Sequence, residues 1–261
     1  MLDNNTIIQI ADDLAEAEKN RTMIPLLTAR YDGMTVEDSY AIQAEWRRRG
    51  VAAGRRLVGR KIGLTSKVMQ DATGITEPDY GAIFADMVFD NGSEIEHGRF
   101  SNVRIETELA FVLSRDLTGP DATVFDVLRA TEYVVPALEI LSSRIEMEGR
   151  TIVDTISDNA AMGAMVYGGN PVDPHQVDLR WVSALLYKNE IIHETGVAAA
   201  ILNHPATGVA WLANKLHAHG DSLSQGDIIL AGSFTRPMWV DKGDTVTADF
   251  KELGTITCRF T

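Results

Sequence analysis

The sequence of 261 residues has one cysteine, no long apolar run and no secretion signal. The single cysteine, Cys258, cannot form an internal disulfide, which excludes a disulfide-stabilised scaffold and indicates a reducing compartment. No run approaches the roughly 18 apolar residues of a membrane helix. The first residues, MLDNN, lack the basic and apolar segments of a secretion signal. We therefore expect a cytoplasmic protein that does not bind a membrane.

The sequence has fewer basic than acidic residues. Lysine and arginine number 24 against 37 aspartates and glutamates, giving a formal net charge of −13. This balance disfavours a nucleic-acid partner. It leaves a small anionic substrate open, because a bound cation or an arginine can reverse the field locally. The hydrophobic content of 45% is that of an ordinary globular protein, and the length allows a substantial core.

The apolar periodicity changes along the chain and predicts an α+β fold. Apolar residues at helical spacing begin with Ile7, Ile10, Ala11 and Leu14. A second helix is expected after Thr35, where Thr35 and Asp38 resemble a capping box. After Gly54 short strands predominate, with a hairpin and one more helix. We expect strands at 57–64, 109–113 and 134–141, a hairpin in 182–194, a helix after Pro205, and short strands in 226–260. The chain is therefore divided into a helical section, residues 1–55, and a strand-rich body, residues 56–261.

Three glutamates are the candidate metal ligands. Glu106 and Glu108 stand two positions apart beside an apolar run, and Glu139 lies in a second apolar run. On a strand, residues i and i+2 project from one face about 6.6–6.8 Å apart. Crowded carboxylates repel one another, and a hard cation such as Mg²⁺ or Mn²⁺ relieves that repulsion. The alternative is an ordinary charged strand edge.

Lys61 and Asp79 are candidates for proton transfer. Lys61 lies between Arg60 and Ile62 on an expected strand, so it either faces the acidic cluster or extends along the surface to water. Asp79 lies in the turn-like segment Glu77–Gly81, where it is either an active-site base or a turn-capping residue.

Two further segments carry polar side chains. The run Asp154–Ala161, which includes Ser157, is either a capped loop or a polar pocket lining. Arg236 follows an expected strand, where it either pairs with a substrate carboxylate or lies on the surface. The histidines lack metal-binding spacing, Cys258 has no histidine partner, and no Gly-x-Ser-x-Gly motif is present.

The order of these motifs resembles a known family. They are Lys61–Ser66, Glu77–Gly81, Ile105–Glu108, Pro136–Glu139, Asp154–Ala160, Leu202–Pro205 and Ser233–Pro237. Over nearly its whole length the chain resembles the fumarylacetoacetase-like superfamily, in its branch of hydratases and decarboxylases. The resemblance implies a mixed β-roll or barrel-like body of the fumarylacetoacetase C-terminal type, and a homo-oligomer. It also implies Mg²⁺ (or Mn²⁺) bound by Glu106, Glu108 and Glu139.

The resemblance further implies an activity in the breakdown of aromatic compounds (the homoprotocatechuate pathway). The reaction would be addition of water to the dicarboxylate 2-oxohept-4-ene-1,7-dioate, with Lys61 and Asp79 transferring protons. Four residues would bind substrate: Gly63 and Leu64 through backbone groups, Ser157 as pocket lining, and Arg236 at the distal carboxylate.

Four alternatives remain open. They are hydration of 2-hydroxypenta-2,4-dienoate, decarboxylation of 4-oxalocrotonate, carbon–carbon bond hydrolysis, and a silent partner subunit of a larger complex. The hydrolysis commonly uses a histidine on an early loop, and residues 66–80 contain none. Retention of all three glutamates, Lys61 and Asp79 argues against a silent subunit.

Overall fold

The computed structural model describes residues 1–67, 70 and 77–261. Part of the region without histidine, residues 68–69 and 71–76, lies outside the described residues. The helices are α1 (Asn4–Asn20), α2 (Leu27–Arg30), α3 (Val36–Ala52), α5 (Val124–Ala130), α6 (Ile152–Ser157) and α7 (Pro205–His217). None of the helices described is long and apolar enough to cross a membrane.

The strands of the described residues form two sheets. The larger runs in the order β2-β1-β10-β5-β6-β7-β3, with β11 added beside β5, and the smaller runs β4-β13-β12-β8-β9. The bounds in the larger sheet are β1 (Leu57–Gly63), β2 (Asp79–Phe84), β3 (Val88–Asp90), β5 (Arg104–Leu113), β6 (Thr131–Leu141), β7 (Met162–Tyr167), β10 (Ile228–Ser233) and β11 (Met238–Trp239). Those in the smaller sheet are β4 (Glu94–Ile95), β8 (Ser183–Lys188), β9 (Ile191–Val197), β12 (Thr245–Asp249) and β13 (Thr255–Phe260).

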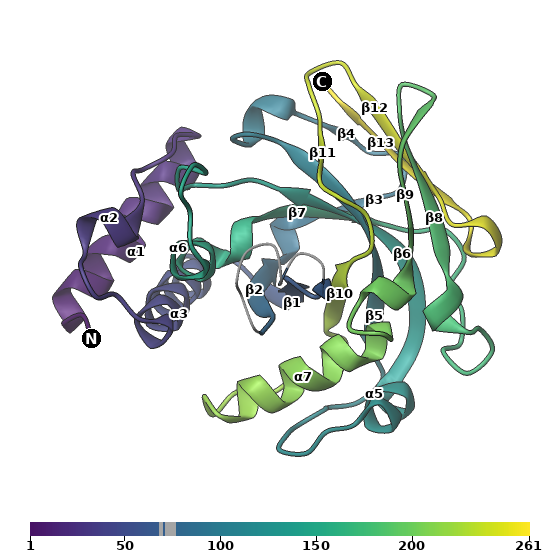
Figure 1. The fold of residues 1–261 in the computed structure, drawn as a ribbon, viewed down its shortest axis with the longest axis horizontal. Coiled ribbons are helices and arrows are strands. Elements are labelled where there is room, and N and C mark those ends of the chain that lie inside the picture. Colours follow the sequence, from purple (N-terminus) through teal and green to yellow (C-terminus); the bar gives the residue numbers. More distant parts are fainter. Residues whose placement is uncertain (68–69, 71–76) are drawn as a thin grey trace.

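The elements separate into a helical side and a strand-rich side. Helices α1, α2, α3 and α6 gather at one side of the molecule, and the smaller sheet lies at the other (Figure 1). Helix α7 runs below the sheets beside α5. The long strands β5 and β6 curve through the body between the helical side and the smaller sheet. The α+β class and the mixed-sheet body are confirmed, whereas the division at residue 55 stays a prediction.

The N-terminal helices follow their sequence signals. Ile10, Ala11 and Leu14 of α1 are buried, as their spacing predicts. At the start of α3 the hydroxyl of Thr35 accepts from the amide of Asp38, and the Asp38 carboxylate accepts from the amide of Thr35. This capping box is confirmed. The α3 side chain Gln43 then donates to the carbonyls of Tyr80 at 2.7 Å and Ile156 at 2.9 Å, which ties the helix to the body.

The expected strands of the body are found with shifted ends, whereas β2, β3, β4 and β7 were not expected, and Asp79–Gly81, predicted as part of a turn, opens strand β2. Strand β5 begins at Arg104, five residues before the expected start, because Ile105 and Thr107 are buried on the face opposite the glutamates. Glu106 and Glu108 therefore lie inside a strand rather than at its head. The hairpin β8–β9 turns at Asn189 and Glu190, both with positive φ, within the expected segment 182–194.

Candidate metal centre and active site

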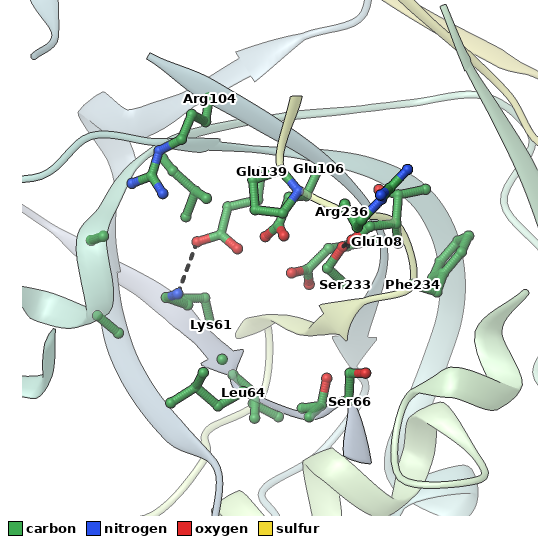
Figure 2. A pocket seen from close by; sticks show the side chains of 18 of the residues that line it. Lys61, Leu64, Ser66, Arg104, Glu106, Glu108, Glu139, Ser233, Phe234 and Arg236 are labelled. Atoms are coloured by element: carbon green, nitrogen blue, oxygen red, sulfur yellow. Dashed lines mark hydrogen bonds and ion pairs between the residues drawn. The ribbon is translucent and has the colours of Figure 1, made fainter. Parts of the chain in front are cut away.

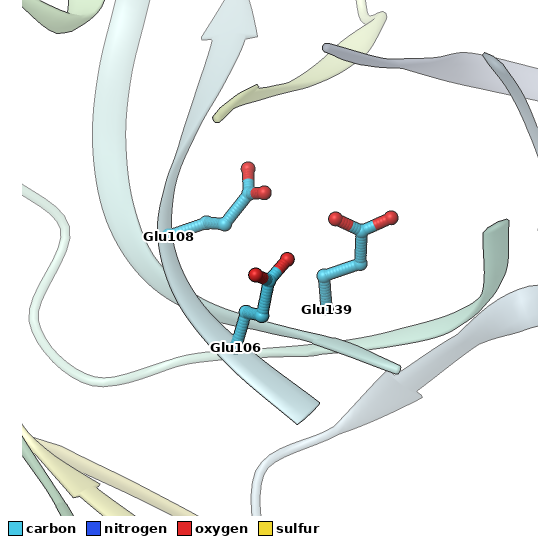
Figure 3. Close-up of side chains that lie close together, drawn as sticks. All are labelled: Glu106, Glu108 and Glu139. Carbon is cyan, nitrogen blue, oxygen red and sulfur yellow. The ribbon is translucent and has the colours of Figure 1, made fainter. Parts of the chain in front are cut away.

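The register of β5 against β6 brings the three glutamates together. Glu106 lies directly opposite Glu139 in this antiparallel pair, and Glu108 follows on the same face of β5. One carboxylate oxygen from each residue lies within 4.8 Å of the other two. Figure 3 shows the three side chains pointing toward one another from the two strands. The convergence is thus a feature of the fold, and the role of these residues as metal ligands stays a prediction.

A bulge in β10 holds Glu108 in this orientation. The pairing of β10 with β5 shifts between Leu230 and Ser233, and the amide of Gly232 in this gap donates to Oε2 of Glu108 at 2.9 Å. Gly232 has φ +117°, and a Cβ there would lie 2.2 Å from Oγ1 of Thr65, so only glycine fits. Within the described residues Oε1 of Glu108 is buried without a hydrogen-bond partner. A buried oxygen left without a partner is costly, and a hard cation would satisfy it.

The pKa values of the glutamates reflect the same crowding. Burial, and then repulsion from Glu139, raises the pKa of Glu106 to about 8. The pKa of Glu108 is raised well above its usual value, again by burial first and by Glu139 second. Carboxyl groups with pKa values raised in this way ionise readily only when a bound cation stabilises their charged form. The donor set of three carboxylates therefore fits a divalent metal of the Mg²⁺ or Mn²⁺ type.

Lys61 lies against the metal centre. Its side chain is buried, and Nζ lies 3.1 Å from Oε1 of Glu139, an ion pair whose angles fall short of a hydrogen bond (Figure 2). Burial alone would lower the pKa of Lys61, but nearby carboxylates, Glu139 and Asp79 first among them, raise it. Of the two readings left open by the sequence, the structure gives the lysine that faces the acidic cluster.

Asp79 occupies the adjacent strand β2, opposite Gly63 of β1. Its side chain is buried, and neither carboxylate oxygen has a hydrogen-bond partner in the part of the chain that is described. Burial raises the pKa of Asp79, against the influence of Lys61. A Cβ on Gly63 would lie 2.2 Å from Oδ1 of Asp79 and 3.2 Å from Nζ of Lys61. Gly63 thus leaves the room in which these two side chains approach each other.

These groups face one cavity of about 660 Å³. The three glutamates, Lys61, Asp79, Gly63 and Leu64 all line it, and Arg236 lines it as well. Leu64 has φ +56°, a conformation that costs energy for a leucine and that often marks a functional loop. The cavity is large enough for a small organic acid.

Two predicted residues differ from their expected setting. Ser157 does not line this cavity, and its hydroxyl donates to the carbonyl of Val153 at 2.8 Å, which satisfies it within α6. The polar run around it, residues 154–161, covers the end of α6 and the turn after it, and Thr155, Ala160 and Ala161 of this run line the cavity, so both readings hold in part. Arg236 has 79% of its side chain exposed and pairs with Glu194 at 2.9 Å.

Several cavity residues were not singled out from the sequence. They include Arg104, Arg150, Met147 and His193. Arg104 had a detectable signal, because it precedes Glu106 by two positions on the same strand face. Arg150 had none, since the loop before α6 brings it to the cavity.

Comparison with known proteins identifies the family of this chain. The description "Fumarylacetoacetate (FAA) hydrolase C-terminal" matches residues 60–261. The chain belongs to this FAA hydrolase family. One family relative, the 2-oxo-hept-4-ene-1,7-dioate hydratase of Escherichia coli, is 52% identical over all of both chains. A 2-keto-4-pentenoate hydratase of Paraburkholderia xenovorans is 38% identical, over 97% of this chain and 94% of the relative.

A solved FAA hydrolase relative matches the whole fold. The 4-oxalocrotonate decarboxylase of Pseudomonas putida, complexed with magnesium and adipate, has a TM-score of 0.97 at 32% identity. The match covers 100% of this chain and 99% of that one. The same decarboxylase is also solved with calcium and acetate. This decarboxylase thus holds a divalent cation and a small carboxylic acid, and the chain is an enzyme of the hydratase and decarboxylase type.

Proposed function

We propose that this chain is a Mg²⁺-dependent hydratase that converts 2-oxohept-4-ene-1,7-dioate to 4-hydroxy-2-oxoheptane-1,7-dioate. The observation that carries the proposal is the convergence of Glu106, Glu108 and Glu139 beside buried Lys61. The hydratase from Escherichia coli, 52% identical over its full length, supports this substrate. Magnesium in the related decarboxylase supports the choice of Mg²⁺ over Mn²⁺. A homo-oligomeric assembly is part of the same proposal.

The three glutamates would hold the cation through the oxygens that now crowd one another. A divalent cation bound there supplies Lewis-acid stabilisation to the 2-oxo acid end of the substrate, where negative charge develops. Glu108 is kept in place by the Gly232 amide, so its free oxygen stays directed at the centre. The backbone at Gly63 and Leu64 lies on the cavity wall, where it would contact the C1 carboxylate.

Lys61 and Asp79 would move the protons. In its enol form, 2-hydroxyhepta-2,4-dienedioate, the substrate loses the proton of its 2-hydroxyl and gains one along the carbon chain. Water then adds at C4 and loses a proton, and C3 gains one. The Lys61 ammonium is kept charged by the carboxylates around it, so Nζ is a proton donor at neutral pH. Burial favours the protonated form of Asp79, so its carboxyl can both hold and return a proton. The pair is buried, which keeps bulk water from competing in these transfers.

A product assay tests the proposal. The purified chain with Mg²⁺ would be given hydroxydienoates of five and seven carbons and 2-oxohex-3-enedioate, with loss of the diene absorbance and the products measured. We expect hydration of the seven-carbon dicarboxylate to be fastest and EDTA to abolish it. Release of CO₂ from the six-carbon diacid as the fastest reaction would instead make the chain a decarboxylase. That is the second candidate, because the decarboxylase superposes over the whole chain. No turnover of any of them would support the silent partner subunit.

A further inference from the structure

Two arginines meet at one hydroxyl on the cavity wall. Nη2 of Arg104 lies 3.2 Å from Oγ of Ser143, and Nη1 of Arg150 donates to the same oxygen at 2.7 Å. Ser143 is fully buried, and both arginines line the cavity that contains the three glutamates. Two guanidinium groups are therefore held close together at one end of the active site.

The charge of this arginine pair is only partly compensated. Arg150 bonds to Asp158 at 3.1 Å, but Asp158 is shared with buried Arg144. Arg104 stacks on the ring of Trp239, with Cζ 5.5 Å from the centroid, and among the described residues it has no carboxylate within ion-pair distance. The Nε atoms of Arg104 and Arg150 are buried and without a hydrogen-bond partner in the same part of the chain. Glu106 and Glu139 act on Arg104 electrostatically, but in the described residues neither bonds to it. Guanidinium groups with unpaired donors are the chemistry of an anion-binding subsite.

Arg236 offers a weaker alternative. Glu194 contacts its guanidinium through both carboxylate oxygens, at 2.9 and 3.1 Å, and the side chain is mostly in water. Pairs as exposed as this contribute little to binding. Figure 2 shows Arg104 and Arg236 on opposite sides of the three glutamates, with Lys61 below Glu139. The two arginines therefore mark two different ends of the cavity.

We propose that Arg104, supported by Arg150, binds the distal carboxylate of the substrate and makes the enzyme selective for dicarboxylates. Arg104 precedes Glu106 by two positions on β5, so the strand spaces the two residues by about 6.6–6.8 Å on one face. A short diacid whose first carboxylate lies at the glutamates can thus reach a guanidinium with its second. The planar fork of Arg104 has unused donors for a bidentate contact. The assignment rests on the proposed function and moves the role of Arg236 to Arg104.

Calorimetric binding of adipate and hexanoate in the presence of Mg²⁺ tests the subsite without turnover. The two acids have equal length and differ in the second carboxylate. We expect Arg104→Gln to weaken the binding of adipate by at least about tenfold and the binding of hexanoate by less than about twofold. Arg104→Lys should recover part of the adipate affinity, because it restores the charge without the fork. The matched control is Arg129→Gln, which removes an exposed arginine of α5 that pairs with Asp126.

Kinetics then compare the seven-carbon and five-carbon substrates. Arg104→Gln should raise KM for the dicarboxylate and leave KM for the monocarboxylate nearly unchanged, with an unaltered Tm. Equal losses for both acids would make Arg104 structural and overturn the inference, and so would a dicarboxylate-selective loss in Arg236→Gln. If the wild-type protein hydrates neither dienoate while adipate binding still depends on Arg104, the proposed reaction falls and the carboxylate subsite stands.

Discussion

Replacing Glu108 with glutamine should stabilise the metal-free protein at alkaline pH and remove its response to Mg²⁺. Glutamine keeps the side-chain oxygen that accepts from the Gly232 amide, so the substitution mainly deletes one charge. The three carboxylates lie within 4.8 Å of one another. At an effective dielectric constant of about 20, each ionised pair at that separation repels by roughly 3 kcal/mol.

The pKa of Glu106 gives an independent magnitude. A rise from 4.5 to about 8 corresponds to roughly 5 kcal/mol of unfavourable free energy when Glu106 is ionised in the folded protein. Because the folded state then binds more protons than the unfolded state, the stability of the metal-free protein falls as pH rises from about 4.5 to 8. This penalty comes first from burial and then from Glu139, whereas the Glu108 charge adds its own repulsion at the separation above; deleting that charge should therefore give a gain of about 1–3 kcal/mol at pH 8.5.

Thermal unfolding in EDTA and in Mg²⁺, at pH 6 and pH 8.5, measures both effects. For a chain of this size each kcal/mol shifts Tm by roughly 2–4 °C, so the variant should melt about 3–10 °C higher than wild type in EDTA at pH 8.5. Mg²⁺ at about 100 times its Kd should stabilise only the wild type, by roughly 2.7 kcal/mol, and more at pH 8.5 than at pH 6. The matched control is Glu94→Gln on β4, an exposed glutamate.

The reasoning is refuted if Glu108→Gln melts below wild type in EDTA at pH 8.5 while Mg²⁺ still raises its Tm. Such a result would mean that the glutamates are stabilised by the fold as they stand and that the cation binds elsewhere. A second contrary result would be a metal-free wild-type protein that becomes more stable between pH 6 and pH 8.5 and a Glu108→Gln variant that lacks this gain. It would count against the carboxylate repulsion in the same way.

Two further predictions concern the proton-transfer pair. Lys61→Met should lower kcat by roughly 100-fold or more while Mg²⁺ still raises Tm, because the buried Nζ beside Glu139 is the proposed proton donor and not a proposed metal ligand; a variant that keeps wild-type kcat would exclude that role. Gly63→Ala should cost about 1–3 kcal/mol in urea unfolding and lower kcat, because its Cβ would lie 2.2 Å from Oδ1 of Asp79; unchanged stability and kcat would show that the strands can separate without loss.

Local patterns predicted those parts of the fold that depend on neighbours in sequence. The capping box at Thr35 fixed the start of α3, and the spacing of Glu106 and Glu108 placed both on one strand face. The position of Glu139 depends on the β5–β6 register, which its apolar surroundings did not determine. The family resemblance implied Glu139 as a metal ligand without giving that register. The bulge at Gly232 could not be anticipated, because it is defined only by the pairing of two strands far apart in the chain.

Side-chain direction in short elements was also beyond the sequence. Ser157 lies in a polar run close to the cavity, yet the rotation of α6 turns its hydroxyl back to Val153. Arg150 reaches the cavity from the loop before that helix, where no periodicity constrains it. The close approach of Gly63 to Asp79 likewise follows from strand pairing, so a glycine expected only to offer backbone groups to the substrate is also a steric requirement.

The strands that carry the glutamates explain how such a centre persists in the folded protein. Like charges directly opposite in an antiparallel pair destabilise it, and Glu106 faces Glu139 in this way. The remainder of the pair is buried and apolar, with Ala110 opposite Val135 and Phe111 opposite Val134. A slip of one residue would turn the carboxylates into the apolar layer, and side chains of the opposite face such as Phe111 and Val134 toward the cavity. The apolar register therefore holds the repelling carboxylates on the cavity side, and a bound cation would turn that repulsion into affinity.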